Sequence, residues 1–156
     1  MFYFFKKNLP FLFLLLFSSP IICQGGLAGS WKGTITIGGL ESNQTKPLEL
    51  YLQIQGKKIT GRSYLELSPG KILVMSIEGV IFGDRSGLFE EKEFFPSDIP
   101  GISPPFFRKY QFVYKRSIWD SSIEGFWQEV LEDPLHNKRS LGRIKLKKVQ
   151  ELPNKA

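Results

Sequence analysis

The sequence is poor in the residues that carry most enzyme chemistry. Its 156 residues include one cysteine, Cys23, and one histidine, His136, which lies in a turn-like stretch where a solvated role is expected. Disulfide frameworks need paired cysteines, and zinc sites need several Cys or His ligands at fixed spacing. The phosphate-binding loop G-x-x-x-x-G-K and the dinucleotide-binding glycine motif are also missing from the sequence. We therefore expect a protein that is not an enzyme, with no catalytic residue, no metal site and no cofactor.

Long apolar runs are confined to the start of the chain. Two lysines precede residues 9–17, which are almost wholly apolar, and small residues follow. This order is typical of a secretory signal peptide, and the run is too short to span about 30 Å of hydrocarbon comfortably. We expect cleavage after Cys23, so that residues 1–23 are the signal and residues 24–28 a flexible lead-in of a secreted or periplasmic protein. Lipidation of Cys23 is the alternative, and only then would the protein contact a membrane.

The charge of the chain gives little indication of a partner. The formal net charge is +6, and several basic residues gather in residues 143–148, which fits a solvated strand face. No basic stripe is interleaved with aromatic side chains on which bases could stack. We expect no nucleic-acid partner.

Alternation of apolar and polar residues predicts an all-β domain over residues 29–149, followed by a polar tail, residues 150–156. Period-two alternation is typical of half-buried antiparallel strands, and no segment keeps a 3.6-residue period over ten positions. The strands are expected at residues 31–37, 48–55, 59–67, 71–82, 88–95, 108–116, 121–131 and 140–149.

Four glycines in these strands favour a barrel. Each follows an apolar and then a polar residue, so the apolar residue and the glycine share one face of a strand. An inward glycine lets a strand coil and lets neighbouring chain approach closely, as closing a small sheet requires. These sequences are Trp31-Lys32-Gly33, Ile59-Thr60-Gly61, Ile77-Glu78-Gly79 and Ile123-Glu124-Gly125. We predict a single antiparallel up-and-down barrel of about eight strands, with a two-sheet sandwich as the alternative.

Short motifs along the domain support this fold by resemblance. Gly29-Ser30-Trp31 resembles the Gly-x-Trp signature of the lipocalin, fatty-acid-binding protein and avidin group of small barrels. The chain more closely resembles an uncharacterised family of secreted bacterial β-barrels, through motifs at residues 29–35, 59–64, 125–127 and 142–146. Because no activity is established for this family, the resemblance implies the fold and leaves the function open. In the lipocalin group a basic residue of the last strand packs over the first-strand Trp, which implies Arg143 or, alternatively, Arg139.

Inward-facing aromatic residues are the first candidates for binding. Trp31, Trp127, Tyr110 and Phe112 are expected on the inner face of the barrel, and Glu129 shares the parity of Trp127. Side chains of this kind either fill the core or line a pocket for a small hydrophobic ligand. Our first hypothesis is a non-catalytic barrel that binds such a ligand in its lumen.

Two carboxylates bear on whether an enzyme is possible. Glu90 shares its parity with Leu88, and Glu129 shares its parity with Trp127, so both are expected to be able to face the interior. Acid–base catalysis would need carboxyl groups that converge in a cleft. A third hypothesis, an enzyme, therefore depends on one of them opening into a cavity.

A long connection supplies the second hypothesis. Residues 94–107 contain four prolines, with paired aromatics at each end, and connections of this length are unusual in a compact domain. They pack on the barrel end or dock a partner, such as a cell-envelope protein. The candidate contact residues are Phe94, Phe95, Phe106 and Phe107. The alternative function is a structural or interaction module of the cell envelope.

Overall fold

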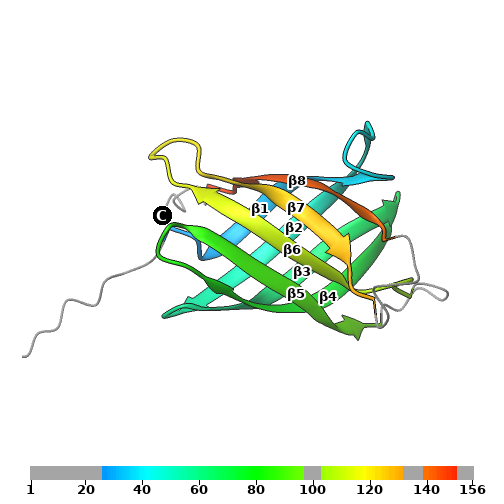
Figure 1. The fold of residues 1–156 in the computed structure, drawn as a ribbon, viewed down its shortest axis with the longest axis horizontal. Coiled ribbons are helices and arrows are strands. Elements are labelled where there is room, and N and C mark those ends of the chain that lie inside the picture. Colours follow the sequence, from blue (N-terminus) through cyan, green and yellow to red (C-terminus); the bar gives the residue numbers. More distant parts are fainter. Residues whose placement is uncertain (1–25, 97–102, 132–138, 151–156) are drawn as a thin grey trace, which may run out of the picture.

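The computed structural model describes residues 26–96, 103–131 and 139–150, which form one closed antiparallel barrel (Figure 1). Its strands are β1 (Gly29–Ile37), β2 (Gln44–Gln55), β3 (Lys58–Ser68), β4 (Lys71–Ile81), β5 (Ser86–Phe95), β6 (Arg108–Lys115), β7 (Ser122–Glu129) and β8 (Leu141–Lys148). The expected signal peptide, His136 and the centre of the proline-rich connection lie outside the described residues.

Each strand pairs with the next one along the chain, and β8 pairs with β1 to close the ring. In the closing ladder Trp31 lies opposite Lys148, and Ile35 opposite Ile144. The prediction of an eight-stranded up-and-down barrel is confirmed, and the two-sheet alternative is wrong. Within the described part of the chain, no helix has the length and apolar character needed to cross a bilayer.

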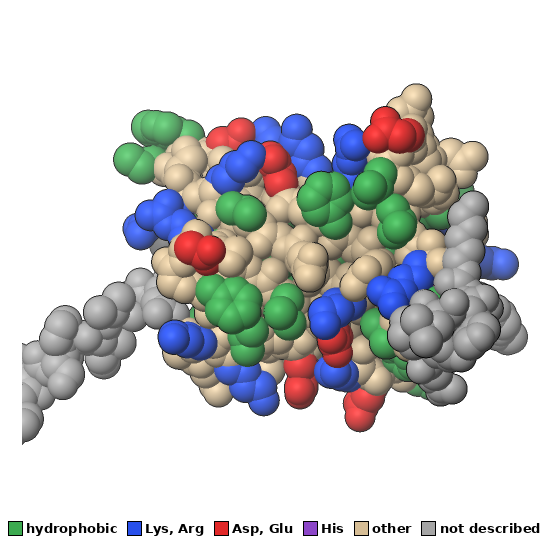
Figure 2. Space-filling view, viewed as in Figure 1, with side chains coloured by type: hydrophobic (Ala, Val, Ile, Leu, Met, Phe, Trp, Pro, Cys, Tyr) green, Lys and Arg blue, Asp and Glu red, His purple; other side chains and the backbone are tan. Residues whose placement is uncertain are grey.

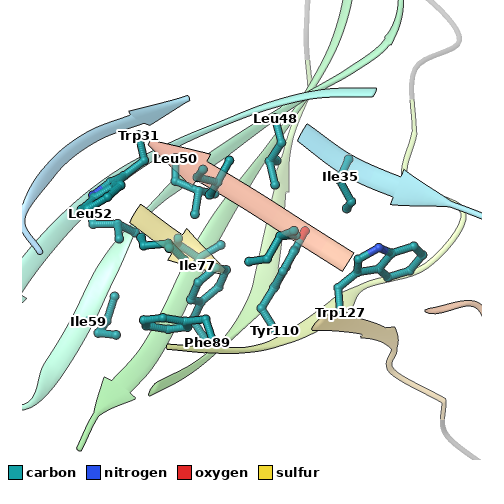
Figure 3. Close-up of a cluster of buried hydrophobic side chains, with 14 of the residues drawn as sticks. Trp31, Ile35, Leu48, Leu50, Leu52, Ile59, Ile77, Phe89, Tyr110 and Trp127 are labelled. Atoms are coloured by element: carbon teal, nitrogen blue, oxygen red, sulfur yellow. The ribbon is translucent and has the colours of Figure 1, made fainter. Parts of the chain in front are cut away.

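The core consists of alternate residues from all eight strands. Trp31 and Ile35 of β1 are fully buried, as are Leu48, Leu50 and Leu52 of β2. Figure 3 shows Trp31 and Trp127 at opposite ends of the cluster, with Ile77, Phe89 and Tyr110 between them. Among the described residues, the buried core runs from Leu27 to Leu146, and the eight strands run from Gly29 to Lys148.

The inward glycines mark places where neighbouring backbone comes close. A Cβ on Gly33 would overlap the carbonyl oxygen of Lys145, and one on Gly61 would overlap that of Tyr51. Gly79 and Gly125 are equally close to the carbonyl oxygens of their own neighbouring strands. The close approach that the sequence pattern indicated is therefore present at all four positions.

The two ends of the barrel carry different connections. At the Trp31 end lie the start of β1, the β2–β3, β4–β5 and β6–β7 connections, and the end of β8 (Figure 1). At the Trp127 end lie the β1–β2, β3–β4, β5–β6 and β7–β8 connections. The candidate residues divide between these two ends.

Replacing an inward glycine should destabilise the barrel strongly. We expect Gly61→Ala to lower the free energy of unfolding by about 3 kcal/mol, because the new methyl group meets backbone that cannot rotate away. Gly83→Ala is the control: Gly83 has open space around its Cβ position, and its φ lies outside the left-handed range. Its effect should stay within about 0.5 kcal/mol. Equal effects in urea denaturation would contradict the close-approach argument.

Candidate functional site

The Trp31 end of the barrel is closed by its own side chains. The Nε1–H of Trp31 donates a hydrogen bond to the carbonyl oxygen of Leu27 over 2.8 Å, and the ring of Tyr114 meets Trp31 edge-on at 5.9 Å. The Nζ of Lys148 lies 5.7 Å from the centre of the Trp31 ring and donates to the carbonyl oxygen of Gly26 over 2.7 Å. The described part of the lead-in, residues 26–28, is thus fastened across the end of the barrel.

The basic residue over Trp31 is Lys148, not Arg143 or Arg139. The guanidinium of Arg143 is paired with exposed Glu41, and that of Arg139 donates to Gln128, both near the other end of the barrel. Only the β1–β8 register, which places Lys148 directly opposite Trp31, reveals the right residue.

The Trp127 end is closed by a second aromatic cluster. The Nε1–H of Trp127 donates to the carbonyl oxygen of Thr36 over 2.9 Å, and the ring of Phe106 stacks on Trp127 at 6.1 Å. The guanidinium carbon of Arg108 lies 5.0 Å from the Phe106 ring centre and 5.6 Å from that of Trp127. Phe106, which precedes β6, therefore helps to cover this end.

A buried ion pair lies inside the barrel beside this cluster. Glu91 and Arg108 are 4% and 3% exposed, and the Arg108 Nη1 is 3.2 Å from the Glu91 Oε2. The same oxygen accepts the Arg108 backbone N–H over 2.9 Å, and the Tyr110 hydroxyl donates to Oε1 over 2.8 Å. One carboxylate thus accepts hydrogen bonds from three separate donor groups in the core.

Burial governs the protonation of this network. Removal from water raises the pKa of the Glu91 carboxyl, although the charge of Arg108 and the hydrogen bond from Tyr110 oppose that shift. Burial also raises the pKa of the Tyr110 hydroxyl well above its ordinary value, and the neighbouring Glu91 charge adds to the shift. Tyr110 therefore acts here as a neutral donor.

The expectation for Glu90 is wrong, because Glu91 is the inward carboxylate. Glu90 lies on the outer wall, where Lys92 and Lys109 pair with it and lower its pKa. The error came from assigning Leu88 to the core, whereas Phe89 is the fully buried residue. Both neighbours are apolar, so alternation alone could not separate them.

A β-bulge follows Glu91 and restores the inward orientation of Phe94 later in β5. Ile77 pairs with Glu91 and Met75 with Phe94, so Lys92 and Glu93 together lie opposite Ser76. The backbone N–H of Glu93 donates to the Ser76 Oγ over 3.0 Å. The extra residue returns Phe94 to the inside, where it packs against the core.

The residues expected to line a ligand-binding lumen lie in the core or at the Trp127 end. Trp31 and Tyr110 are fully buried, Trp127 and Phe112 nearly so, and all four belong to the core cluster. Glu129 is half-buried at the Trp127 end, and its Oε2 accepts the backbone N–H of Ser140 over 3.0 Å. Their contact with a ligand stays a prediction.

The described ends of the long connection, residues 94–96 and 103–107, lie mainly against the barrel. Phe94 and Phe106 pack on the core, and Phe95 lies 4.8 Å below the guanidinium of Arg62. Phe107 is the exposed member of the four. Its exposed ring is the part of this segment best placed to meet a partner.

Among the described residues, two of the hollows that open to the outside bear on the candidate site. The larger, of about 670 Å³, lies at the Trp31 end between the lead-in segment, the β6–β7 loop (residues 116–121) and the end of β8. The smaller, of about 250 Å³, lies on the outer wall among Leu40, Phe126 and Leu141. Neither Glu90 nor Glu129 lines either one.

The β6–β7 loop carries the most exposed large apolar side chains among the described residues. Ile118 is 90% exposed and Trp119 is 83% exposed. Figure 2 shows hydrophobic side chains at the tip of this loop, which projects beyond the wall of the barrel. The sequence reasoning considered Trp31 and Trp127 and missed Trp119; its position between two expected strands, flanked by Ser117 and Ser121, was the available signal.

Hydrogen bonds hold this loop in one shape. Ser117 Oγ accepts the backbone N–H groups of Trp119 and Asp120, and Ser121 Oγ bridges the N–H and carbonyl of Ser117. Two side chains from the β8 end tie the loop down: Lys147 pairs with Asp120 over 2.8 Å, and Gln150 donates to the carbonyl of Trp119 over 3.0 Å. The apolar tip is therefore exposed on an ordered support.

The structure assigns this chain to the closed eight-stranded antiparallel β-barrels. No protein-family model, no curated protein and no solved structure matches this chain. In the described residues, no three His, Cys, Asp or Glu side chains gather as metal ligands would.

Removing one member of the buried pair should cost more than removing both. We expect Glu91→Leu to lower the free energy of unfolding by about 3–5 kcal/mol, because Arg108 is left charged and unpaired in the core. Adding Arg108→Met should recover much of this loss, leaving about 1–2 kcal/mol for the orphaned N–H and the Tyr110 hydroxyl. Strictly additive effects in urea denaturation would show that the two side chains do not interact.

The raised pKa of Glu91 predicts the direction of a pH effect. The folded protein holds this proton more tightly than the unfolded chain does. Its free energy of unfolding therefore falls as pH rises from the ordinary glutamate pKa of 4.5 through the raised one. We expect the wild type to lose stability across this window relative to Glu91→Gln, which has no proton to lose there. Urea midpoints measured between about pH 4 and pH 8 test this, and parallel profiles would refute it.

Proposed function

We propose that this chain is a non-catalytic interaction module of the cell envelope, which binds its partner through the Trp31 end. The observation that carries the proposal is the exposure of Ile118 and Trp119 on an internally hydrogen-bonded loop. Exposure of large apolar side chains to water at such a tip is unfavourable in the free protein. A preformed loop loses little conformational entropy when a partner covers it, and Trp is the residue most enriched in binding hot spots.

The hollow beside the loop adds to this support. Its volume of about 670 Å³ lies within the range of natural ligand sites, and its lining includes Tyr114 and Trp119 together with Arg116 and Lys148. A partner that covers the loop can therefore place a group of its own against both apolar and basic side chains.

The interior of the barrel has less support as a binding site. Trp31, Tyr110, Phe112 and Trp127 are buried against one another and against the lead-in segment or Phe106. A ligand would have to displace these contacts. We therefore prefer the interaction module to the lumen binder, and we place its contact surface at the end opposite the proline-rich connection.

Location and kinship are parts of the same proposal. The basic and then apolar character of residues 1–23 supports export to the periplasm or the medium. The Gly-x-Trp start of β1, with Lys148 of the last strand packed over Trp31, supports a relationship with the lipocalin and avidin group.

Site-specific photocrosslinking tests the proposed surface. We expect Trp119→p-benzoylphenylalanine to crosslink an envelope component in cells that make the protein, because this side chain would lie in the interface. The control is Tyr51→p-benzoylphenylalanine, because Tyr51 is exposed on the outer wall of β2. We expect it to give at least about fivefold less crosslinked product, since the partner contacts the loop and not this wall. Equal labelling at both positions, or none at Trp119, would overturn the proposal.

A further inference from the structure

We propose that the Trp31 end binds the surface of an anionic lipid bilayer, with Ile118 and Trp119 inserted at the headgroup level. The inference rests on the proposed function and names its partner. Three observations carry it: the chemistry of the loop tip, the charge of the surrounding barrel end, and the point at which the N-terminal segment joins the barrel.

The tip has the composition of an interfacial anchor. Trp prefers the boundary between headgroups and hydrocarbon, where its ring is apolar and its N–H can reach water or lipid oxygens. Ile118 beside it adds a purely aliphatic group of the kind that enters the acyl region. Both project from an ordered loop rather than from the barrel wall, so they can enter a bilayer while the β-barrel stays outside it.

The surrounding surface is basic. At the Trp31 end the described turns and strand ends carry three acidic side chains, Asp84, Asp120 and Glu124, of which Asp120 pairs with Lys147 and Glu124 with Lys115. Seven basic residues lie at the same end: Lys57, Lys58, Arg85, Lys115, Arg116, Lys147 and Lys148. Anionic headgroups attract such a cluster, and the attraction weakens with distance over a Debye length.

The opposite end has a smaller excess of basic residues. Its described turns and strand ends carry Lys46, Lys71, Lys109, Arg139 and Arg143, besides Arg108, whose charge is paired with Glu91 inside the barrel. The acidic residues at that end are Glu41, Glu66, Glu93 and Glu129. The basic excess is therefore larger at the end that also presents the apolar tip.

The covalent chain also meets the barrel at this end. Gly26 is fixed against Lys148, and the preceding 25 residues, with their apolar run at 9–17, join here. An N-terminal attachment to the membrane, by a retained leader or by a lipid on Cys23, would place this end next to the bilayer. The Trp31 end is thus the end that such an attachment would present to lipid.

Vesicle binding tests the inference directly. Trp119 is the exposed member of three tryptophans, while Trp31 and Trp127 are buried, so changes in acrylamide quenching and the lipid-induced emission shift report mainly on the tip. The chain without residues 1–23 keeps the whole barrel and removes the contribution of the leader. On vesicles with about one-third anionic phosphatidylglycerol we expect a blue shift of the emission and at least about twofold less quenching by acrylamide.

Matched variants separate the tip from the charge. Trp119→Ser and Ile118→Ser should each weaken co-sedimentation with these vesicles by about tenfold, whereas Phe126→Ser, an equally drastic change on the exposed side wall, should leave it unchanged. Arg116→Glu should weaken binding by about tenfold, and Lys71→Glu, the same charge change at the opposite end, should have less than about a twofold effect. Emission of the buried tryptophans verifies that each variant is folded.

Several outcomes would overturn the lipid inference. Equal binding to neutral phosphatidylcholine vesicles, or none to anionic ones, would do so. Self-association through Trp119, seen by analytical ultracentrifugation, would assign the surface to a second copy. If photocrosslinks at Trp119 lead to a protein while vesicles do not bind, the proposed function stands and its partner is that protein. If both assays fail, the proposed function falls as well.

Discussion

The whole structure depends on closing a narrow ring of eight strands. Closure requires that β8 return to β1, and the ring is narrow enough that backbone carbonyl oxygens occupy the places where Cβ atoms of Gly33 and Gly61 would lie. Because the barrel is narrow, one tryptophan near each end, with a few neighbouring side chains, is enough to cover the interior. The inner aromatics pack against one another as part of the core, and the exposed large apolar side chains of the described residues lie at the ends and on the outer wall.

Much of this fold could be predicted from the sequence. Alternation identifies the strands because each has one face in the core, and the repeated apolar–polar–glycine pattern indicates closure because inward glycine is required by close approach. The inward face of β6 also follows from alternation, which places Tyr110 and Phe112 correctly. Arg108 shares that parity, so the same reasoning could have identified one half of the buried ion pair.

The rest needed three-dimensional information. Leu88 and Phe89 are both apolar, so the face of β5 was ambiguous, although Gly87 shares the buried face of Phe89 and Glu91. Lys148 could be matched with Trp31 only through the register of the first and last strands. The exposure of Ile118 and Trp119 contradicts the usual preference of apolar side chains for the core, and no sequence pattern states which apolar residues a loop leaves outside.

Closure of the hydrogen-bond ladder also determines how any partner can attach. Every strand of the barrel has a neighbour on both sides, so the ring offers no edge strand to which an extended peptide could add. Recognition must then use side chains at the turns or on the wall, and it can change by substitution of a few loop residues while the backbone ladder stays intact. In such a barrel the binding specificity can therefore change while the fold stays the same.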